Sequence, residues 1–148
     1  MSATIRPIKP SDHDGWRSLF TDYGVFYHTE FADPQLTTVW GWLMDPSHPH
    51  NAWVAELDGE LVGFAHLRQH SDTFTGGPAW YLDDLFTSPA ARGHGIATRI
   101  IAALRAHADA NGGGTISWIT ADDNVTAQSV YNKVATRARW VTYELTAG

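Results

Sequence analysis

The stretch that decides the fold is LFTSPAARGHGIATR, Leu85–Arg99. An apolar run ends at Thr87, Ser88-Pro89 predicts a turn, and a helical pattern begins beside Gly93 and Gly95. The first N–H groups of a helix have no partner inside it, and the helix dipole adds partial positive charge there. Because glycines let an anion approach the backbone, this stretch predicts a phosphate-binding turn between a strand and a helix.

Hydrophobic periodicity predicts the elements on either side of this turn. Asp58-Gly59 is typical of a tight hairpin turn. Four helices are expected: one capped by Ser11, one that begins near Asp33-Pro34, one over about His94–Ala110 and one over Asn124–Lys133. The expected strands are Thr4–Ile8, Ala52–Leu57, Leu61–Leu67, Ala79–Thr87, Thr115–Thr120 and Trp140–Leu145. This order of strands and helices predicts an α/β (α+β) fold.

The composition indicates a folded domain, since 43% of the 148 residues are hydrophobic and 18% are charged. No linker divides the chain, so we expect a single domain over residues 1–148. The chain has no cysteine, which excludes disulfides, thiolate metal sites and a cysteine nucleophile. No segment approaches the ~20 apolar residues of a membrane span, and the start lacks a signal-peptide core. We therefore expect a cytoplasmic protein that does not engage a membrane.

The net charge of −6 is concentrated in the first half of the chain. Residues 1–72 contain four basic and ten acidic side chains, whereas residues 73–148 contain six of each. An acidic surface repels nucleic acid and attracts cations, so we expect no nucleic-acid partner. A cationic substrate and simple solubility both explain the charge at this point.

Three nucleotide-binding patterns compete for Arg92–Thr98. A Walker P-loop requires a lysine followed by serine or threonine, which this stretch lacks. A dinucleotide-binding fingerprint, G-x-G-x-x-G, would begin at Gly93, but Thr98 stands at the position of its third glycine. The stretch also lies too late in the chain for the two halves of a dinucleotide-binding fold. The pattern [RQ]-x-x-G-x-[GA] is matched by Arg92-Gly-His-Gly-Ile-Ala97.

This pattern, placed between a strand and a long helix, resembles the phosphate loop of the GNAT N-acetyltransferase superfamily. A second family signature follows as Asn124-Val-Thr-Ala-Gln-Ser-Val-Tyr131. The resemblance implies a mixed, mostly antiparallel sheet of about six or seven strands with helices on both faces, and acetyl-CoA as co-substrate. The residues it implies for acetyl-CoA are Leu85, Phe86 and Thr87 at the acetyl and pantetheine groups, and Arg92, Gly93, His94, Gly95, Ile96, Ala97 and Thr98 at the pyrophosphate.

Acetyl transfer to an amine requires a deprotonated amine, a stabilised oxyanion and a neutralised leaving thiolate. The resemblance implies that backbone N–H groups of residues 85–87 meet the carbonyl and that Tyr131 protonates the thiolate. A phenol, with a pKa of about 10, holds its proton at neutral pH. Packing in the core is the alternative role for Tyr131. Asn124 binds the pantetheine arm, caps a helix, or does both.

Asp83 and Asp84 are the candidate catalytic carboxylates on the amine side. Neighbours in a regular strand point to opposite faces, so we expect only one of them to face the substrate. The stretch around them resembles diamine and polyamine acetyltransferases, which have an acidic residue at the Asp83 position and imply an amine-binding role for it. An ion pair with an arginine for one aspartate, and solvation of the other, is the alternative.

The chain end resembles the Hpa-type branch of the superfamily, which also tends to have an aromatic first helix. Tyr23 and Tyr27 of this chain are therefore candidate substrate-binding residues, because aromatic rings can hold the alkyl part and the charge of an amine. Core packing is the alternative for both. The histidine pairs His48/His50 and His66/His70 lack a third ligand at a recognised spacing, so we predict no metal site.

The combined expectation is an acetyl-CoA-dependent N-acetyltransferase that acts by direct attack in a ternary complex. The expected partner is a small-molecule primary amine, with a small amine or a polyamine favoured. A protein or peptide acetyltransferase, acting on lysine or an N-terminus, and a non-catalytic acyl-CoA-binding module are the alternatives. The expected last strand, with Trp140, Val141 and Tyr143, can pair with a second copy of the chain, which suggests a homodimer.

Overall fold

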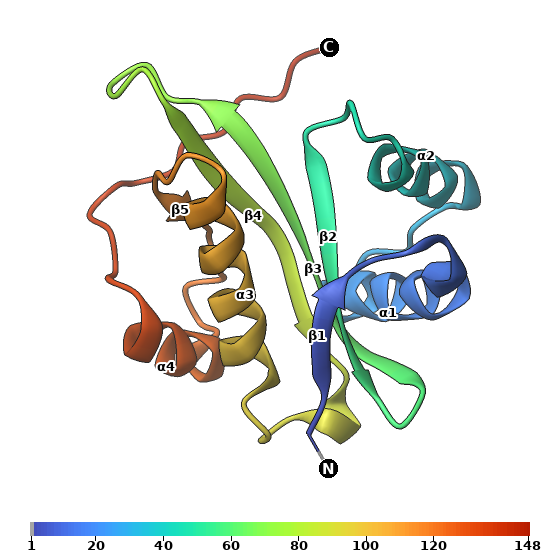
Figure 1. Ribbon diagram of the computed structural model, residues 1–148. Helices are drawn as coiled ribbons and strands as arrows, with labels where there is room; N and C mark the ends of the chain where they lie inside the picture. The colour runs from blue at the N-terminus through green and yellow to red at the C-terminus, as the bar shows by residue number, and fades with distance from the viewer. Residues whose placement is uncertain (1) are drawn as a thin grey trace. The chain divides into compact units, whose positions relative to one another are not determined.

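The computed structural model describes residues 2–148, and the chain divides into two compact units, Met1–Trp118 and Ile119–Gly148. The first unit contains a sheet and three α-helices, and the second contains one α-helix (Figure 1). The strands are β1 (Thr4–Pro7), β2 (His50–Leu57), β3 (Glu60–Ser71), β4 (Pro78–Thr87) and β5 (Ile116–Ser117). The helices of the first unit are α1 (His13–Phe26), α2 (Asp33–Met44) and α3 (Ile96–Ala110).

The five strands form one sheet in the order β1-β2-β3-β4-β5. Every neighbouring pair is antiparallel except β4 and β5, which are parallel. The mostly antiparallel sheet confirms the expected fold class, although it has five strands where six or seven were expected. The strand expected over Thr115–Thr120 is reduced to the two residues of β5, which pair with Trp80 and Tyr81 of β4.

The hairpin between β2 and β3 forms where the sequence predicts it. Asp58 and Gly59 both have positive φ, 52° and 81°, as a two-residue type I′ turn requires. Asp58 tolerates this conformation better than most side chains, and Gly59 has no Cβ to oppose it. This turn sets the register of β2 and β3, which contribute His50, His66 and Arg68 to the site described below.

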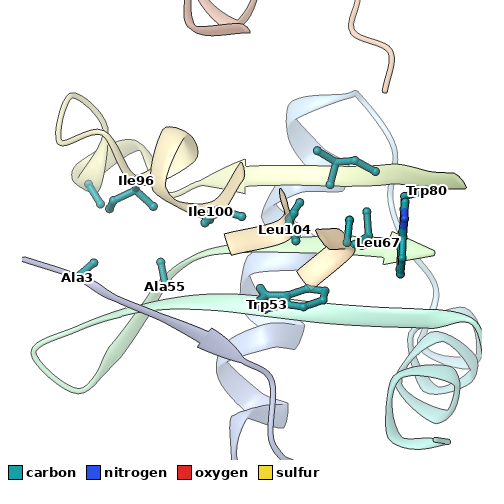
Figure 2. Close-up of a cluster of buried hydrophobic side chains, with 12 residues drawn as sticks. Ala3, Trp53, Ala55, Leu67, Trp80, Ile96, Ile100 and Leu104 are labelled. Carbon is teal, nitrogen blue, oxygen red and sulfur yellow. The ribbon is translucent and has the colours of Figure 1, made fainter. Parts of the chain in front are cut away.

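One face of the sheet is covered by α3 (Figure 1). The side chains Ile96, Ile100, Leu104 and Ala108 recur at helical spacing along α3 and are all buried. They pack on Trp53 of β2, Leu67 of β3 and Trp80 of β4, and Figure 2 shows Ile96, Ile100 and Leu104 in this cluster. This layer holds the start of α3, and with it the glycine-rich turn, at the end of β4.

The opposite face is covered by α1 and α2. Trp16, Leu19 and Phe20 of α1 and Leu36 of α2 pack on Val54, Phe64 and Phe86 of the sheet, and all seven side chains are buried. Helices therefore lie on both faces, as expected. Burying a large apolar side chain contributes about 1.5–3 kcal/mol, so these two layers hold the sheet between its helices.

The start of α1 differs from the expected Ser11 cap. Ser11 lies inside a short 3₁₀ turn, Pro10–Asp12, and α1 begins at His13. The carboxylate of Asp12 accepts hydrogen bonds from both terminal nitrogens of Arg6, at 2.7 and 2.9 Å, and from the N–H of Lys9 at 2.9 Å. A charge-assisted bridge from β1 thus fixes the helix entry, and the serine hydroxyl is not needed there.

The second unit contains α4 (Val125–Val134), close to the expected helix. Asn124 caps it, since its Oδ1 accepts a hydrogen bond from the N–H of Ala127 at 3.2 Å. The expected strand Trp140–Leu145 is wrong: residues 136–148 form neither helix nor strand. The segment alternates as a strand does, but a strand requires hydrogen bonds to a neighbour, and no strand of residues 2–148 pairs with it.

None of the helices formed by residues 2–148 has the length and apolar character that crossing a membrane requires.

Candidate active site

The glycine-rich turn between β4 and α3 has the backbone conformation that its sequence predicts. Gly93 and Gly95 have φ of 84° and 71°, in the left-handed region where a side chain is strained. A Cβ added to either residue would meet no heavy atom within 4 Å. The missing side chains are therefore not required by packing, and the outer side of the turn is open.

The N–H groups of the turn are free to bind a ligand. No N–H group of residues 93–98 donates a hydrogen bond to another group within residues 2–148. The first internal hydrogen bond of the turn runs from the N–H of Arg99 to the carbonyl of Gly95, at 3.0 Å. Consecutive unpaired N–H groups at the start of a 15-residue helix form a site for an anion.

The Arg92 side chain packs against the end of β4. Its Nε–H donates to the carbonyl of Thr87 at 3.1 Å. The guanidinium carbon lies 5.6 Å from the ring centroid of Phe26 and 5.7 Å from that of Phe86. These contacts hold the chain between Thr87 and Gly93 in one conformation, with the Arg92 charge beside α1.

The second half of β4 has a free edge. Towards β3 the strand is paired along its length, but on the other side β5 pairs only with Trp80 and Tyr81. Residues 82–87 therefore have no strand partner on that side among the described residues. This segment contains Leu85, Phe86 and Thr87, the residues expected at the acetyl and pantetheine groups, and it leads directly into the glycine-rich turn.

A β-bulge in β4 places both aspartates on one face of the sheet. His66 of β3 pairs with Asp84 and the next residue, Leu67, pairs with Leu82, so Asp83 is an extra residue in the ladder. Asp84 hydrogen-bonds to His66, which lies under α1, and Asp83 hydrogen-bonds to His50. The expectation that the two side chains point to opposite faces is wrong, because it assumes a regular strand.

The Asp83 carboxylate is neutralised by its neighbours. Arg68 Nε–H donates to its two oxygens at 3.1 and 3.4 Å, and His50 Nε2 lies 2.9 Å from Oδ2. Burial lowers the pKa of His50 below its ordinary value, although Asp83 opposes the shift. The imidazole is therefore neutral at pH 7, and its Nε2–H donates to Asp83, while its buried Nδ1 has no hydrogen-bond partner within residues 2–148.

The Asp84 carboxylate has a different environment. Its Oδ2 accepts a hydrogen bond from Nδ1 of His66 at 2.8 Å. Its Oδ1 forms no hydrogen bond within residues 2–148, and no arginine or lysine of that range forms a salt bridge with it. The negative charge also acts on two phenols: burial first and then Asp84 raise the pKa of Tyr27, and both contribute at Tyr81.

Sequence reasoning missed the role of His66, which it considered only as half of a metal pair. His66 is 2% exposed and lies between apolar neighbours in β3. Its Nε2 accepts a hydrogen bond from the indole N–H of Trp16 at 2.9 Å, so the N–H group that donates to Asp84 is at Nδ1. The available signal was a lone histidine inside an otherwise apolar strand, since a buried polar group needs partners.

The two tyrosines expected at the substrate have different surroundings. Tyr23 is half-buried and its ring contacts those of Phe20, Phe64 and Phe86, which is core packing. Tyr27, the residue that follows α1, is 42% exposed, and the charge of Asp84 contributes to its raised pKa after burial. Tyr27 is therefore the more exposed of the two tyrosines.

The remaining residues named from the sequence are Asn124, Tyr131, His94 and the candidate metal-binding histidines. Asn124 and Tyr131 both lie in the second unit, at the cap and within α4, and Tyr131 is half-buried. His94 is exposed in the glycine-rich turn. His48 and His50 form a stack with Trp42, with ring centroids 5.1–5.5 Å apart. Within residues 2–148, no group of three or more potential metal ligands is formed.

The sequence is similar to known N-acetyltransferases. The sequence model described as "Acetyltransferase (GNAT) family" matches residues 16–135. The D-amino-acid N-acetyltransferase HPA3 of Saccharomyces cerevisiae is 28% identical over 144 residues, which cover 95% of this chain and 88% of that protein. The uncharacterized N-acetyltransferase YhfO of Bacillus subtilis is 30% identical over 129 residues, covering 87% of this chain and 86% of its own.

Solved structures share the fold. The aminoglycoside N-acetyltransferase AAC(6')-Iy in complex with CoA superposes with a TM-score of 0.84 at 21% identity, covering 97% of this chain and 94% of that one.

Proposed function

The chain belongs to the Acetyltransferase (GNAT) family and is an N-acetyltransferase, and we propose that it transfers the acetyl group of acetyl-CoA to a small cationic amine. The observation that carries this proposal is the placement of two groups on β4 and the turn that follows it. One is the negatively charged Asp84, which has no cationic partner within residues 2–148. The other is the run of free N–H groups over residues 93–98.

The turn suits the pyrophosphate of acetyl-CoA. Its open outer side, the two glycines in left-handed conformation and the N–H groups of residues 93–98 match what a phosphate needs from a protein backbone. We assign the pyrophosphate to Arg92–Thr98 and the acetyl and pantetheine groups to the free edge at Leu85, Phe86 and Thr87. When bound, acetyl-CoA supplies the activated acetyl group as a thioester.

The amine binds at Asp84 in this proposal. An alkylamine has a pKa of about 10.4, so it arrives as an ammonium ion and must lose a proton before its nitrogen can attack. An ionised carboxylate without a cationic partner attracts that ion and accepts its proton, directly or through water. Asp83 is less suited, because the Arg68 guanidinium already balances its charge and His50 occupies one of its oxygens with a hydrogen bond. Tyr27 supplies an aromatic wall for the alkyl part.

Tyr131 acts as the acid that protonates the leaving thiolate. A phenol holds its proton at neutral pH, and the family signature Asn124–Tyr131 ends on this residue. The family match runs from residue 16 to residue 135 and so spans both compact units. For that reason we propose that residues 1–148 act as one catalytic domain. We also propose a cytoplasmic location, which agrees with the cysteine-free sequence.

An amino acid is the second candidate for the acceptor. The yeast relative, 28% identical over 95% of this chain, is a D-amino-acid N-acetyltransferase. Arg68 binds Asp83 through Nε alone, which leaves its two terminal nitrogens without a hydrogen bond inside residues 2–148. An amino acid could place its ammonium group at Asp84 and its carboxylate at Arg68, since a guanidinium binds carboxylates well.

The test is the release of free CoA from acetyl-CoA in the presence of a panel of amines, followed by a thiol reagent. The panel contains spermidine, a set of D- and L-amino acids and a lysine-rich peptide. Preference for spermidine supports the first candidate, and preference for a D-amino acid supports the second. A preference for the peptide indicates a protein acetyltransferase. Binding of CoA in calorimetry with no acetylation of any amine would contradict the enzymatic proposal and indicate a binding module.

We further propose that the protein is a homodimer formed through the end of the chain. Trp140, Val141, Tyr143 and Leu145 are 75–96% exposed in a segment without helix or strand. An alternating apolar segment of this kind can pair as a strand with another chain. A second copy of the same protein supplies an identical segment, and pairing the two would remove these side chains from water.

A further inference from the structure

A buried series of hydrogen bonds runs from Trp16 of α1 through His66 to Asp84. Trp16 Nε1 donates to His66 Nε2 at 2.9 Å, and His66 Nδ1 lies 2.8 Å from Asp84 Oδ2. Trp16 is 0% and His66 2% exposed. This series of hydrogen bonds thus begins in the core under α1 and ends at the Asp84 carboxylate of β4, where the amine is proposed to bind.

The indole determines which tautomer His66 adopts. An indole N–H only donates, so His66 Nε2 must accept and cannot hold a hydrogen. In a neutral imidazole the other nitrogen then carries the proton, and His66 Nδ1–H donates to Asp84. Protonation of Nε2 would bring two N–H groups against each other and would cost the buried indole its only hydrogen bond, which is worth about 1–3 kcal/mol.

Aromatic side chains surround the ring of His66. The ring centroids of Phe20 and Phe64 each lie 4.8 Å from that of His66, and these side chains replace water around it. The ionisable groups that act on the His66–Asp84 pair are Tyr27 after α1, His50 of β2 and Tyr81 of β4 itself, and none of them is a permanent cation.

We propose that His66 is a positioning residue for acetyl transfer: fixed by Trp16 as the neutral Nδ1–H tautomer, it orients the Asp84 carboxylate and leaves its full negative charge for the acceptor amine. This inference rests on the proposed function, in which Asp84 binds the amine. A cationic partner would cancel the charge of Asp84, as Arg68 does for Asp83. A neutral donor holds one oxygen in place and leaves Oδ1 available.

The tautomer is tested first, in the wild-type protein and without any substrate. The ¹⁵N spectrum of the His66 imidazole at pH 7.5 should show a protonated Nδ1 and an unprotonated Nε2. Protonation of both nitrogens, or of Nε2 alone, would overturn the inference. This measurement does not depend on activity.

The role of His66 in catalysis is tested with two variants of His66 and one of Trp16. His66→Leu removes the donor to Asp84 and should lower kcat about 10- to 100-fold, since a misplaced catalytic group costs that much, with the KM for acetyl-CoA unchanged. His66→Asn keeps an N–H donor near the position of Nδ1 and should restore part of the loss. Trp16→Phe should lower kcat and allow the ¹⁵N signal of Nε2 to show protonation.

Trp80→Phe is the matched control for Trp16→Phe. Trp80 is equally buried, at 2% exposure, and its indole N–H also makes one hydrogen bond, to the carbonyl of Gly113 at 2.8 Å. It packs on the α3 face, away from His66. Its replacement should cost similar stability and leave kcat and the His66 spectrum unchanged. A loss of kcat as large in Trp80→Phe as in Trp16→Phe would assign both effects to stability and overturn the inference.

The outcomes separate this inference from the proposed function. If the wild type acetylates no amine, the proposed function fails, and the role of His66 in amine acetylation fails with it. If the wild type is active while His66→Leu and Trp16→Phe retain its kcat, the inference about His66 fails and the proposed function stands.

Discussion

Asp83 and Asp84 follow each other in β4, and yet both side chains bond to the same face of β3, Asp83 to Arg68 and Asp84 to His66. A bulge of one residue produces this arrangement. It gives two adjacent carboxylates different environments, one paired with a guanidinium and one hydrogen-bonded to a buried imidazole. Five predictions follow from this site, from the turn beside it and from the rest of the fold.

Asp84→Asn should lower kcat/KM for the amine by about 10²–10⁴-fold, the range for loss of a general base. Asp83→Asn is the matched control, because it changes the neighbouring residue in the same way. It should have a much smaller effect on activity, since the Asp83 charge is already balanced by Arg68. Steady-state kinetics with the best amine of the panel measures both. A larger loss in Asp83→Asn would reverse the assignment of the two carboxylates.

Gly95→Ala should weaken CoA binding about 10- to 100-fold, because the added methyl group strains the left-handed turn and lies on its open side, where the pyrophosphate is proposed to bind. This range corresponds to losing one hydrogen bond to a charged group. The control is Gly76→Ala, because Gly76 has the same φ of 71° and an equally open Cβ position in the loop between β3 and β4. Both variants should lose about 1–2 kcal/mol of stability to the left-handed conformation. Titration calorimetry separates them, and equal affinity for CoA in both would remove the turn from the binding site.

Tyr131→Phe should reduce turnover about 10²-fold or more while the Kd for acetyl-CoA stays close to that of the wild type. The hydroxyl is the proposed proton donor, and the ring that packs in α4 is retained. Tyr143→Phe, at a residue 92% exposed, removes the same hydroxyl from a site outside the proposed chemistry and should leave turnover unchanged. Full turnover in Tyr131→Phe would exclude it as the acid.

Asp12→Asn should lower the free energy of unfolding by about 1.5–3 kcal/mol at pH 7, because it removes a charged partner from Arg6. The hydrogen bond from Arg6 is the largest cause that lowers the pKa of Asp12 below 3.8, outweighing burial. A lowered folded-state pKa gives stability that is present above pH 3.8 and is lost as the pH falls through the folded value. The difference from the wild type should therefore vanish in acid.

Thermal unfolding at pH 7 and at acidic pH measures this difference, with an expected Tm decrease of roughly 3–12 °C at pH 7. Asp14→Asn is the control, since Asp14 lies two residues after Asp12, in the first turn of α1, with a fully exposed side chain. It should change Tm little. A difference between Asp12→Asn and the wild type that persists unchanged in acid would contradict the electrostatic explanation.

Trp140→Ser should convert a dimer into a monomer in sedimentation experiments, because Trp140 is 90% exposed in the segment proposed to pair between copies. Phe74→Ser removes an aromatic side chain that is 97% exposed in the loop between β3 and β4, and it should remain dimeric. A wild-type protein that sediments as a monomer at micromolar concentration would refute the dimer.

Much of the fold was predictable because the relevant physics is local. The turn Asp58-Gly59 and the conformation of Gly93 and Gly95 follow from which residues accept positive φ. The apolar side chains of α3 recur at helical spacing, which predicts both the helix and its buried face. The cap at Asn124 involves residues only three positions apart. None of these features depends on a distant part of the chain.

The wrong expectations involve contacts that form only in the folded sheet. The Ser11 cap was displaced by a bridge from Arg6 to Asp12, which exists only once β1 is in the sheet. The strand Trp140–Leu145 has suitable residues but no neighbouring strand within the described chain. Sequence alternation shows that a segment can form a strand, and only a partner makes it one.

The amino-acid sequence by itself indicated the glycine-rich turn, most of the helices and strands, and the family, since each depends on residues close together in the chain. The tertiary structure decided which of the two carboxylates is left without a cationic partner. That outcome requires a bulge against β3, a histidine 18 residues from Asp84 and a tryptophan 50 residues from that histidine. Hydrogen bonds between such distant groups form only when the sheet and α1 pack together, so no local pattern could reveal them.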